Sequence, residues 1–83
     1  MSVGVYELPV RGVDTQTPHT EDEIYYVLKG QGRFEVEGVE RTVAIGDVLF
    51  VPARAKHHFH DITQALSLLV VFAPAEKVDL PAG

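Results

Sequence analysis

Hydrophobic residues along the chain alternate with polar ones or form short continuous runs, and glycine, proline and charged residues separate these runs. No stretch of useful length has the three-to-four-residue spacing of an amphipathic helix. Short strands bounded by turn residues are typical of an all-β protein. The pattern predicts strands over Val3–Leu8, Ile24–Lys29, Gly32–Glu37, Glu40–Ile45, Val48–Val51, His57–Ile62 and Leu66–Phe72.

Glycine and proline mark the connections between these strands. KGQGR and VEGVE each place glycine between two strand-like runs, and glycine readily adopts the positive φ that tight hairpins need. We expect hairpin turns at both, a turn at AIGDV, and a strand end at Pro52 in VPARAK. Seven short strands at close spacing predict a sandwich or a barrel.

The run LSLLVVF, residues 66–72, is apolar at six of its seven positions. A strand with one face in water alternates, so this strand should be covered on both faces. Two interpretations stay open: it is a central strand of the sheet, or a second subunit covers it.

The chain has 83 residues, so residues 1–83 are read as a single domain whose end, about 73–83, is a Pro- and Ala-rich tail. A domain of this size buries only about 60–65% of its unfolded surface. A second copy would enlarge the buried core, and we therefore expect a homodimer.

Charge and composition exclude several classes of function. The net charge is −5 and lysine and arginine do not cluster, which argues against nucleic acid or an anionic membrane as partner. The absence of cysteine excludes disulfides, thiolate zinc sites and thiol catalysis. The start MSVGVYELP lacks the features of a secretory signal, and no apolar run approaches 18 residues. We expect a cytoplasmic protein with a small-molecule partner.

The residues that can carry chemistry lie in two segments, PHTEDEIYY and KHHFHD. Residues two apart in a strand share a face, so His58 and His60 point one way while His57 and Phe59 point the other. Spacing therefore leaves two possible metal-binding faces, and ligand chemistry alone favours the His58 and His60 pair.

The first segment carries an acidic residue at the head of an apolar strand face. Glu23 shares one such face with Tyr25 and Val27 if the strand begins there. Asp22 shares the other face with Ile24, Tyr26 and Leu28, so this segment also leaves two faces open. A carboxylate there needs a hydrogen bond, an ion pair or a cation. Glu21 and Asp22 fit a solvated strand end.

Taken together, HTEDEIYYVLKGQG and, further along the chain, GDVLFVPARAKH resemble the two motifs of the cupin superfamily. The first motif runs His-x-His, three or four residues, Glu, six residues, Gly. The second runs Gly, five residues, Pro-x-Gly, two residues, His, three residues, Asn. The chain matches these spacings at His19, Glu23, Gly30, Gly46, Pro52 and His57.

Three positions depart from the motifs. Thr17 stands in place of the first histidine, Arg54 in place of the second motif's glycine, and Asp61 in place of the asparagine. At Arg54 the turn either avoids positive φ or tolerates strain. The missing histidine keeps a metal-free pocket open as an alternative.

The resemblance implies a small cupin-like antiparallel β-barrel, the jelly roll or double-stranded β-helix, with its pocket inside. It implies that His19, Glu23 and His57 bind a divalent transition metal, Fe, Mn, Ni or Zn, with positions left for water or substrate. The imidazoles must be neutral to bind it. His58 and His60 would then face outward or into a subunit contact.

Glu23 and Tyr25 are the candidate catalytic residues, and without a metal Glu23 could act as a general base. The aromatic residues that could line the pocket are Tyr25, Phe34, Phe50 and Phe59, with Tyr25 and Phe59 favoured by their strand parity. Arg33 shares its strand face with Glu35, so it either forms a cross-strand or same-face ion pair or anchors a substrate carboxylate.

Three functional hypotheses follow. The first is a metal-dependent enzyme acting on a small organic molecule, as a dioxygenase, isomerase, lyase or decarboxylase. The second is a module that binds a small ligand or a metal without turnover. The third is a metal-free barrel used for protein interaction.

Overall fold

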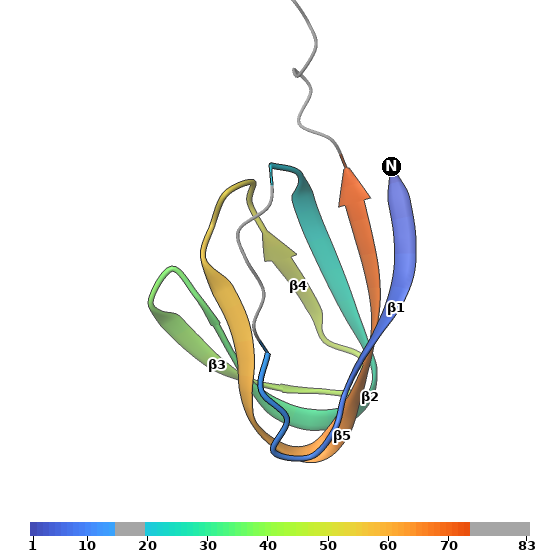
Figure 1. Ribbon diagram of the computed structural model, residues 1–83, viewed down its shortest axis with the longest axis vertical. Helices are drawn as coiled ribbons and strands as arrows, with labels where there is room; N and C mark the ends of the chain where they lie inside the picture. The colour runs from blue at the N-terminus through green and yellow to red at the C-terminus, as the bar shows by residue number, and fades with distance from the viewer. Residues whose placement is uncertain (15–19, 74–83) are drawn as a thin grey trace, which may run out of the picture.

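The structure is a computed structural model and describes residues 1–14 and 20–73. Its five strands are β1 (Ser2–Leu8), β2 (Asp22–Val36), β3 (Val39–Ala44), β4 (Val48–Val51) and β5 (His57–Ala73). All pairings are antiparallel, in the order β1-β5-β2-β3, and β4 pairs with β2. The long strands β2 and β5 bend, so the sheet curls around a central core (Figure 1). The predicted all-β antiparallel barrel is confirmed.

The predicted hairpin turn at KGQGR is wrong, because β2 continues through it. The β2–β5 ladder shifts register three times between Val27 and Arg33. Gly30 has φ 95, and a Cβ at this position would lie 2.1 Å from the carbonyl oxygen of Ala65. Glycine is needed here because the backbone of β5 comes too close for a side chain, and the irregular ladder bends β2 instead of reversing it.

Opposite this irregular part of β2, the two predicted strands 57–62 and 66–72 run on as the single strand β5.

The other turns form as predicted. Glu37 (φ 49) and Gly38 (φ 81) make a two-residue hairpin of the kind in which both residues have positive φ. Gly46 (φ 88) lies in the turn between β3 and β4, and Pro52 follows the end of β4. Ala73 ends β5, and the rest of the predicted tail lies outside the described residues.

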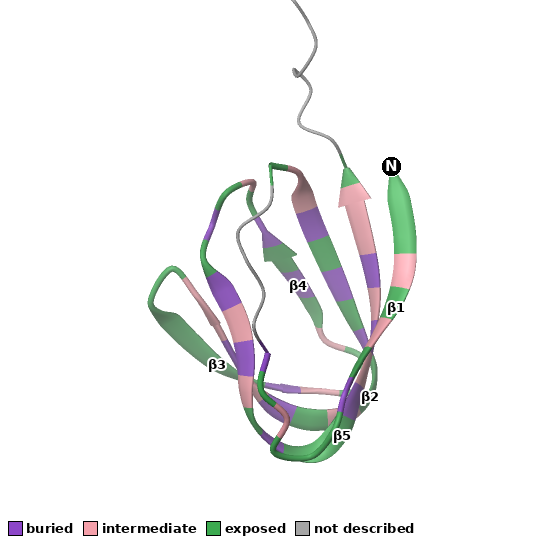
Figure 2. Ribbon diagram, viewed as in Figure 1, coloured by how far each residue is buried: buried purple, intermediate pink, exposed green. Residues whose placement is uncertain are grey.

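Buried and exposed residues alternate along the strands, as Figure 2 shows most clearly on β2. On β2 the inward residues Glu23, Tyr25 and Val27 are at most 1% exposed, whereas Ile24 and Tyr26 are 42% and 41% exposed. The predicted parity of this strand is therefore confirmed, and Glu23 is turned into the core.

The loop after β1 is fastened to β5 by a buried carboxylate. Asp14 accepts hydrogen bonds from the Tyr6 hydroxyl at 2.7 Å and from the backbone N–H of Phe59 at 2.8 Å. Burial, followed by the bond to Asp14, raises the pKa of the Tyr6 hydroxyl, so it stays a neutral donor. The loop after β1 is thus held against the barrel at Asp14, the last residue described before the gap.

Two apolar rows cross the outer face of β4, β2, β5 and β1. The register places in one row Phe50, Ile24, Val71 and Val3, and in the other Val48, Tyr26, Leu69 and Val5. Six of these side chains are 41–63% exposed, and the two on β5 are intermediate. LSLLVVF is therefore a central strand with one face in the core and an outer face that the chain covers only in part.

Within the described residues there is no helix, and hence none long and apolar enough to cross a membrane.

Candidate metal centre

Glu23 and His57 meet inside the barrel although neither is the other's partner in the sheet. Glu23 lies opposite Val51 and Phe72, and His57 lies opposite Val36 at the far end of β2. The curl of the sheet closes the gap, so that Nε2 of His57 lies 3.0 Å from Oε1 of Glu23. These residues are 5% and 1% exposed.

The surroundings of His57 determine which ring nitrogen carries a proton. Its Nδ1 lies 2.9 Å from the carbonyl oxygen of Ala55, which can only accept, so Nδ1 is the donor. In the neutral ring Nε2 is then an acceptor that faces a carboxylate oxygen, which is also an acceptor. Oε1 of Glu23 has no hydrogen bond of standard geometry within the described part of the chain. Two acceptors at this distance need a proton or a cation between them.

Tyr25 fixes the other side of the carboxylate. Its hydroxyl donates to Oε2 of Glu23 at 3.1 Å and lies 3.3 Å from Nε2 of His57. Its ring packs edge-on against Phe34 and Phe59, with centroids 5.9 and 5.1 Å away. The packing holds the hydroxyl in place, so Tyr25 orients Glu23 with Oε1 directed at His57.

These contacts fit a bound divalent transition metal. A ligating histidine commonly donates its second N–H to a backbone carbonyl, which fixes the tautomer, and a ligating carboxylate is itself hydrogen-bonded. His57 and Glu23 satisfy both conditions through Ala55 and Tyr25. The third predicted ligand, His19, and the substituted position, Thr17, lie outside the described residues.

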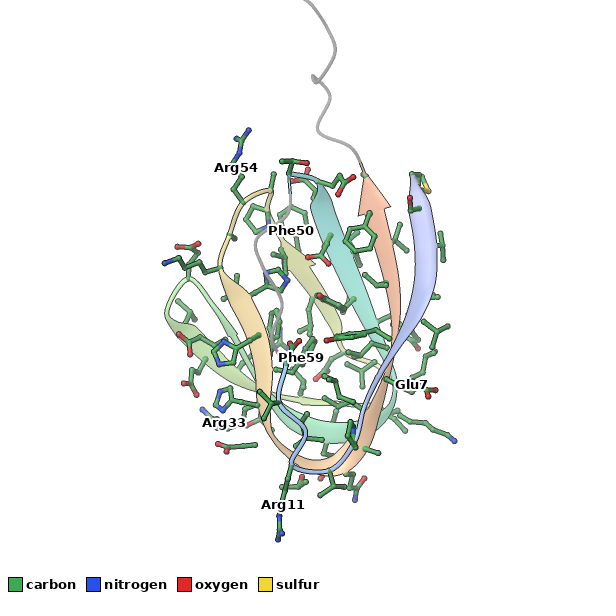
Figure 3. The ribbon with its side chains drawn as sticks, viewed as in Figure 1. Glu7, Arg11, Arg33, Phe50, Arg54 and Phe59 are labelled. Carbon is green, nitrogen blue, oxygen red and sulfur yellow. The ribbon has the colours of Figure 1, made fainter. Side chains whose placement is uncertain are left out.

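The structure separates the predicted aromatic residues into two groups. Tyr25, Phe34 and Phe59 are at most 1% exposed and surround the buried pair, as the central position of Phe59 in Figure 3 illustrates. Phe50 is 58% exposed, so the interpretation that it lines a pocket is wrong. On β4 the inward positions belong to Leu49 and Val51, which leaves Phe50 on the outer face.

Arg33 lies on the outer side of the barrel (Figure 3) and forms an ion pair with Glu40 at 3.0 Å. Of the two predicted kinds of ion pair, the cross-strand one is present, because Glu40 lies on the neighbouring strand β3. With its side chain outside, Arg33 does not anchor a substrate in the barrel interior.

Two residues at the mouth of the barrel behave differently from the simplest expectation. Arg54 has φ 67, so the turn does not avoid positive φ and instead tolerates the strain.

Asp22 is more than a solvated strand end, because its Oδ1 accepts a hydrogen bond from the backbone N–H of Ala53 at 2.8 Å. It thereby ties β2 to the loop that supplies the Ala55 carbonyl to His57. The sequence carries no signal for this hydrogen bond, because an aspartate at the start of a strand is usually solvated.

His58 and His60 point away from this centre, as the parity of β5 predicts. They are intermediate in burial, whereas His57 and Phe59 are buried. The strand face favoured by ligand chemistry alone is thus the outer one, and the face favoured by the resemblance is the inner one.

Residues 4–72 match the cupin domain family. The chain belongs to this family. The match covers every described strand except the first two residues of β1 and the last of β5. The barrel is therefore that of a cupin.

Known proteins similar to this cupin include both uncharacterized proteins and enzymes. It is 48% identical over 78 residues to an uncharacterized protein of Streptomyces coelicolor, covering 93% of this chain and 73% of that protein. It is 37% identical over 46 residues to an acireductone dioxygenase of Bacillus thuringiensis, covering 49% of this chain and 27% of the dioxygenase. The crystal structure of the DMSP lyase DddQ from Ruegeria pomeroyi superposes with a TM-score of 0.81 and 25% identity, over 90% of this chain and 39% of the lyase. The chain thus spans well under half of either enzyme.

Proposed function

We propose that this cupin is a metal-dependent enzyme acting on a small organic molecule, of the dioxygenase, isomerase, lyase or decarboxylase type. The observation that carries the proposal is the 3.0 Å approach of two acceptor atoms, Nε2 of His57 and Oε1 of Glu23, in the buried interior. The similarity to a dioxygenase and a lyase supports an enzymatic role.

In this proposal His57, Glu23 and His19 hold the metal, which is Fe, Mn, Ni or Zn. When bound, such an ion supplies a Lewis acid that polarises a substrate oxygen or activates a bound water. Two histidines and one carboxylate leave coordination positions open for that purpose.

The protein residues around the ion have separate tasks. The Ala55 carbonyl keeps the proton of His57 on Nδ1, and the Tyr25 hydroxyl holds Oε2 of Glu23. The rings of Phe34 and Phe59 exclude water from one side of the pair. A small substrate with an apolar body and one or two polar groups suits such surroundings.

Without a metal, the same residues form a proton-sharing group. A proton between Nε2 of His57 and Oε1 of Glu23 would satisfy both acceptors, and Glu23 could then act as a general base. The threonine at position 17 keeps a metal-free barrel, or a binding module without turnover, as the second candidate.

We also propose that the protein is a homodimer in the cytoplasm, and that a second copy covers the two apolar rows described above. Six of the eight residues are 41–63% exposed, and a contiguous apolar face of this kind is typical of a protein–protein contact. The rows carry no charge, so the same surface of a second copy can lie against them. Light scattering should give a dimer for the wild type and a monomer for Ile24→Glu. A monomeric wild type would contradict this arrangement.

Metal content tests the proposed centre. Tag-free protein should retain close to one equivalent of metal through extensive buffer exchange, and Glu23→Gln and His57→Ala should lose it. Glu7→Gln is the control, because this exposed carboxylate lies on β1 and belongs neither to the buried pair nor to the group of histidines on the outer face. Wild type that takes up no tightly held metal, even after incubation with Fe(II), Mn(II), Ni(II) and Zn(II), would refute the metal-dependent enzyme and favour the metal-free barrel.

A further inference from the structure

The outer face of the barrel carries a second group of potential metal ligands. Glu35 on β2 and His58 and His60 on β5 each offer one ligand atom, and these three atoms lie within 4.8 Å of one another. All three side chains are partly buried, between 26% and 43% exposed. The group shares no residue with the buried centre of Glu23 and His57.

The sheet register holds this group together. Glu35 lies directly opposite His58 across the β2–β5 ladder, with Nε2 of His58 3.9 Å from its Oε1. His60 follows His58 by two residues on the same face, and their rings lie 5.1 Å apart at an angle of 34°. Cross-strand pairing and strand parity thus fix all three backbone positions, and only side-chain rotation remains to be set.

The surroundings of His60 leave one of its ring nitrogens available as a ligand. Its Nδ1 lies 3.3 Å from Oδ2 of Asp61, an arrangement in which a carboxylate holds the Nδ1 proton and leaves Nε2 as the acceptor. Nε2 is shielded from solvent and has no hydrogen bond of standard geometry among the residues that the structure describes. This Nε2 atom lies 3.4 Å from Oε1 of Glu40, so two acceptor atoms face each other here as well.

The charges around the group favour a cation. Glu35 and Glu40 are direct cross-strand partners, and like charges opposite each other destabilise a sheet. Arg33 offsets only one of them, because its guanidinium binds Glu40 through Nε at 3.1 Å and through a terminal nitrogen at 3.0 Å. Arg33 therefore leaves the charge of Glu35 without compensation, and Glu35 lies beside the imidazoles of His58 and His60. A divalent ion bound there would offset the repulsion between Glu35 and Glu40.

We propose that Glu35, His58 and His60 form a second metal site on the outer face, suited to a borderline divalent ion such as Zn(II), Ni(II) or Cu(II). Two imidazoles and a carboxylate are an established ligand set for Zn(II), with one position left for water or another ligand. Ligand atoms bound to Zn(II) lie roughly 3.3 Å apart, so the three side chains must draw together by about an ångström. Their partial exposure leaves the rotational freedom for this.

Zinc stoichiometry tests the site independently of the buried centre. Tag-free wild-type protein is equilibrated with Zn(II) by dialysis, and bound zinc per chain is measured at increasing free zinc. The double variant His58→Asn and His60→Asn should bind one equivalent less than the wild type, and Glu35→Gln should bind that equivalent at least tenfold more weakly. Glu7→Gln, which removes an exposed carboxylate from β1, is the matched control and should bind as the wild type does.

The possible results separate this site from the proposed enzyme. Failure of the buried centre alone would leave one equivalent in the wild type and none in the double variant, which still supports the outer site. Equal binding by the wild type and the double variant would overturn it. A loss of zinc in Glu7→Gln as large as that in Glu35→Gln would overturn it as well, because binding would then follow surface charge.

Discussion

His57 and His58 are neighbours in β5, yet the barrel gives them opposite environments. The side chain of His57 is 1% exposed and held by a carbonyl, a carboxylate and a hydroxyl at fixed distances. The side chain of His58 is 43% exposed, and its contact with Glu35 is as long as 3.9 Å. Strand alternation can therefore place two groups of potential ligands on opposite faces of one strand. Burial determines which group has its side chains held in position before a ligand binds. In the two proposals the side chains of the inner site are already in position, whereas those of the outer site must draw together around an ion.

The largest difference between the two faces should appear in stability. Phe59 is fully buried and packs on Phe34 with ring centroids 4.5 Å apart, so Phe59→Ala should lower the free energy of unfolding by about 3–5 kcal/mol. His58→Ala, on the outer face, should change it by about 0.5 kcal/mol or less. Urea denaturation followed by circular dichroism measures both. Comparable losses in the two variants would mean that the outer face is as tightly packed as the inner one.

A ligand substitution should remove metal from one face only. Glu23→Gln preserves the size of the side chain but replaces a charged ligand oxygen with an amide, so affinity at the buried centre should fall by at least about 100-fold. The variant Glu35→Gln makes the same chemical change on the outer face and should leave tightly held metal in place. Elemental analysis after buffer exchange compares them. Retention of tightly held metal by Glu23→Gln would exclude the carboxylate as a ligand.

Removing one hydroxyl should sharpen the comparison further. Tyr25→Phe keeps the ring that packs on Phe59 but frees Oε2 of Glu23, so metal affinity should fall about 10–100-fold with the fold intact. A competition titration with a chelator measures the affinity. Unchanged affinity, with an unchanged circular dichroism spectrum, would show that Tyr25 only packs and does not orient Glu23.

The smallest expected effect concerns the loop that leads into His57. Arg54 has φ 67, a conformation that costs a residue with a side chain about 1–2 kcal/mol. Arg54→Gly removes this strain but adds the backbone entropy that glycine loses on folding, so the variant should be more stable by about 0.5–1 kcal/mol. Ala53→Gly, at a position without positive φ in the same loop, is the control and should destabilise it. Thermal unfolding distinguishes the two. Destabilisation by Arg54→Gly would mean that contacts of the arginine outweigh the strain.

Strand parity was predictable from the sequence wherever alternation was clear. The pattern put Glu23 and Tyr25 on one face and placed His57 opposite to His58, and the structure confirms both. It could not say which face was inside, because a short histidine-rich strand offers ligands on either side. The resemblance to cupin motifs made that choice.

The errors came from long-range geometry. Glycine at position 30 suggested a turn, but its role depends on the close approach of Ala65, a residue far along the chain. The pattern allowed Arg33 either a cross-strand or a same-face ion pair, and only the β2–β3 register, which brings Glu40 near it, decides for the cross-strand one. Phe50 was one of four candidates for the pocket lining, but its position on β4 turns it outward. Local patterns do not contain these contacts.

The most direct test of the account is a zinc titration followed by nitrogen NMR of the histidine side chains. The account predicts that the first equivalent shifts Nε2 of His57 while its Nδ1 stays protonated, and that the signals of His58 and His60 move only at higher zinc. Shifts of His58 and His60 with the first equivalent, and none at His57, would contradict the claim that the buried face is the organised metal centre.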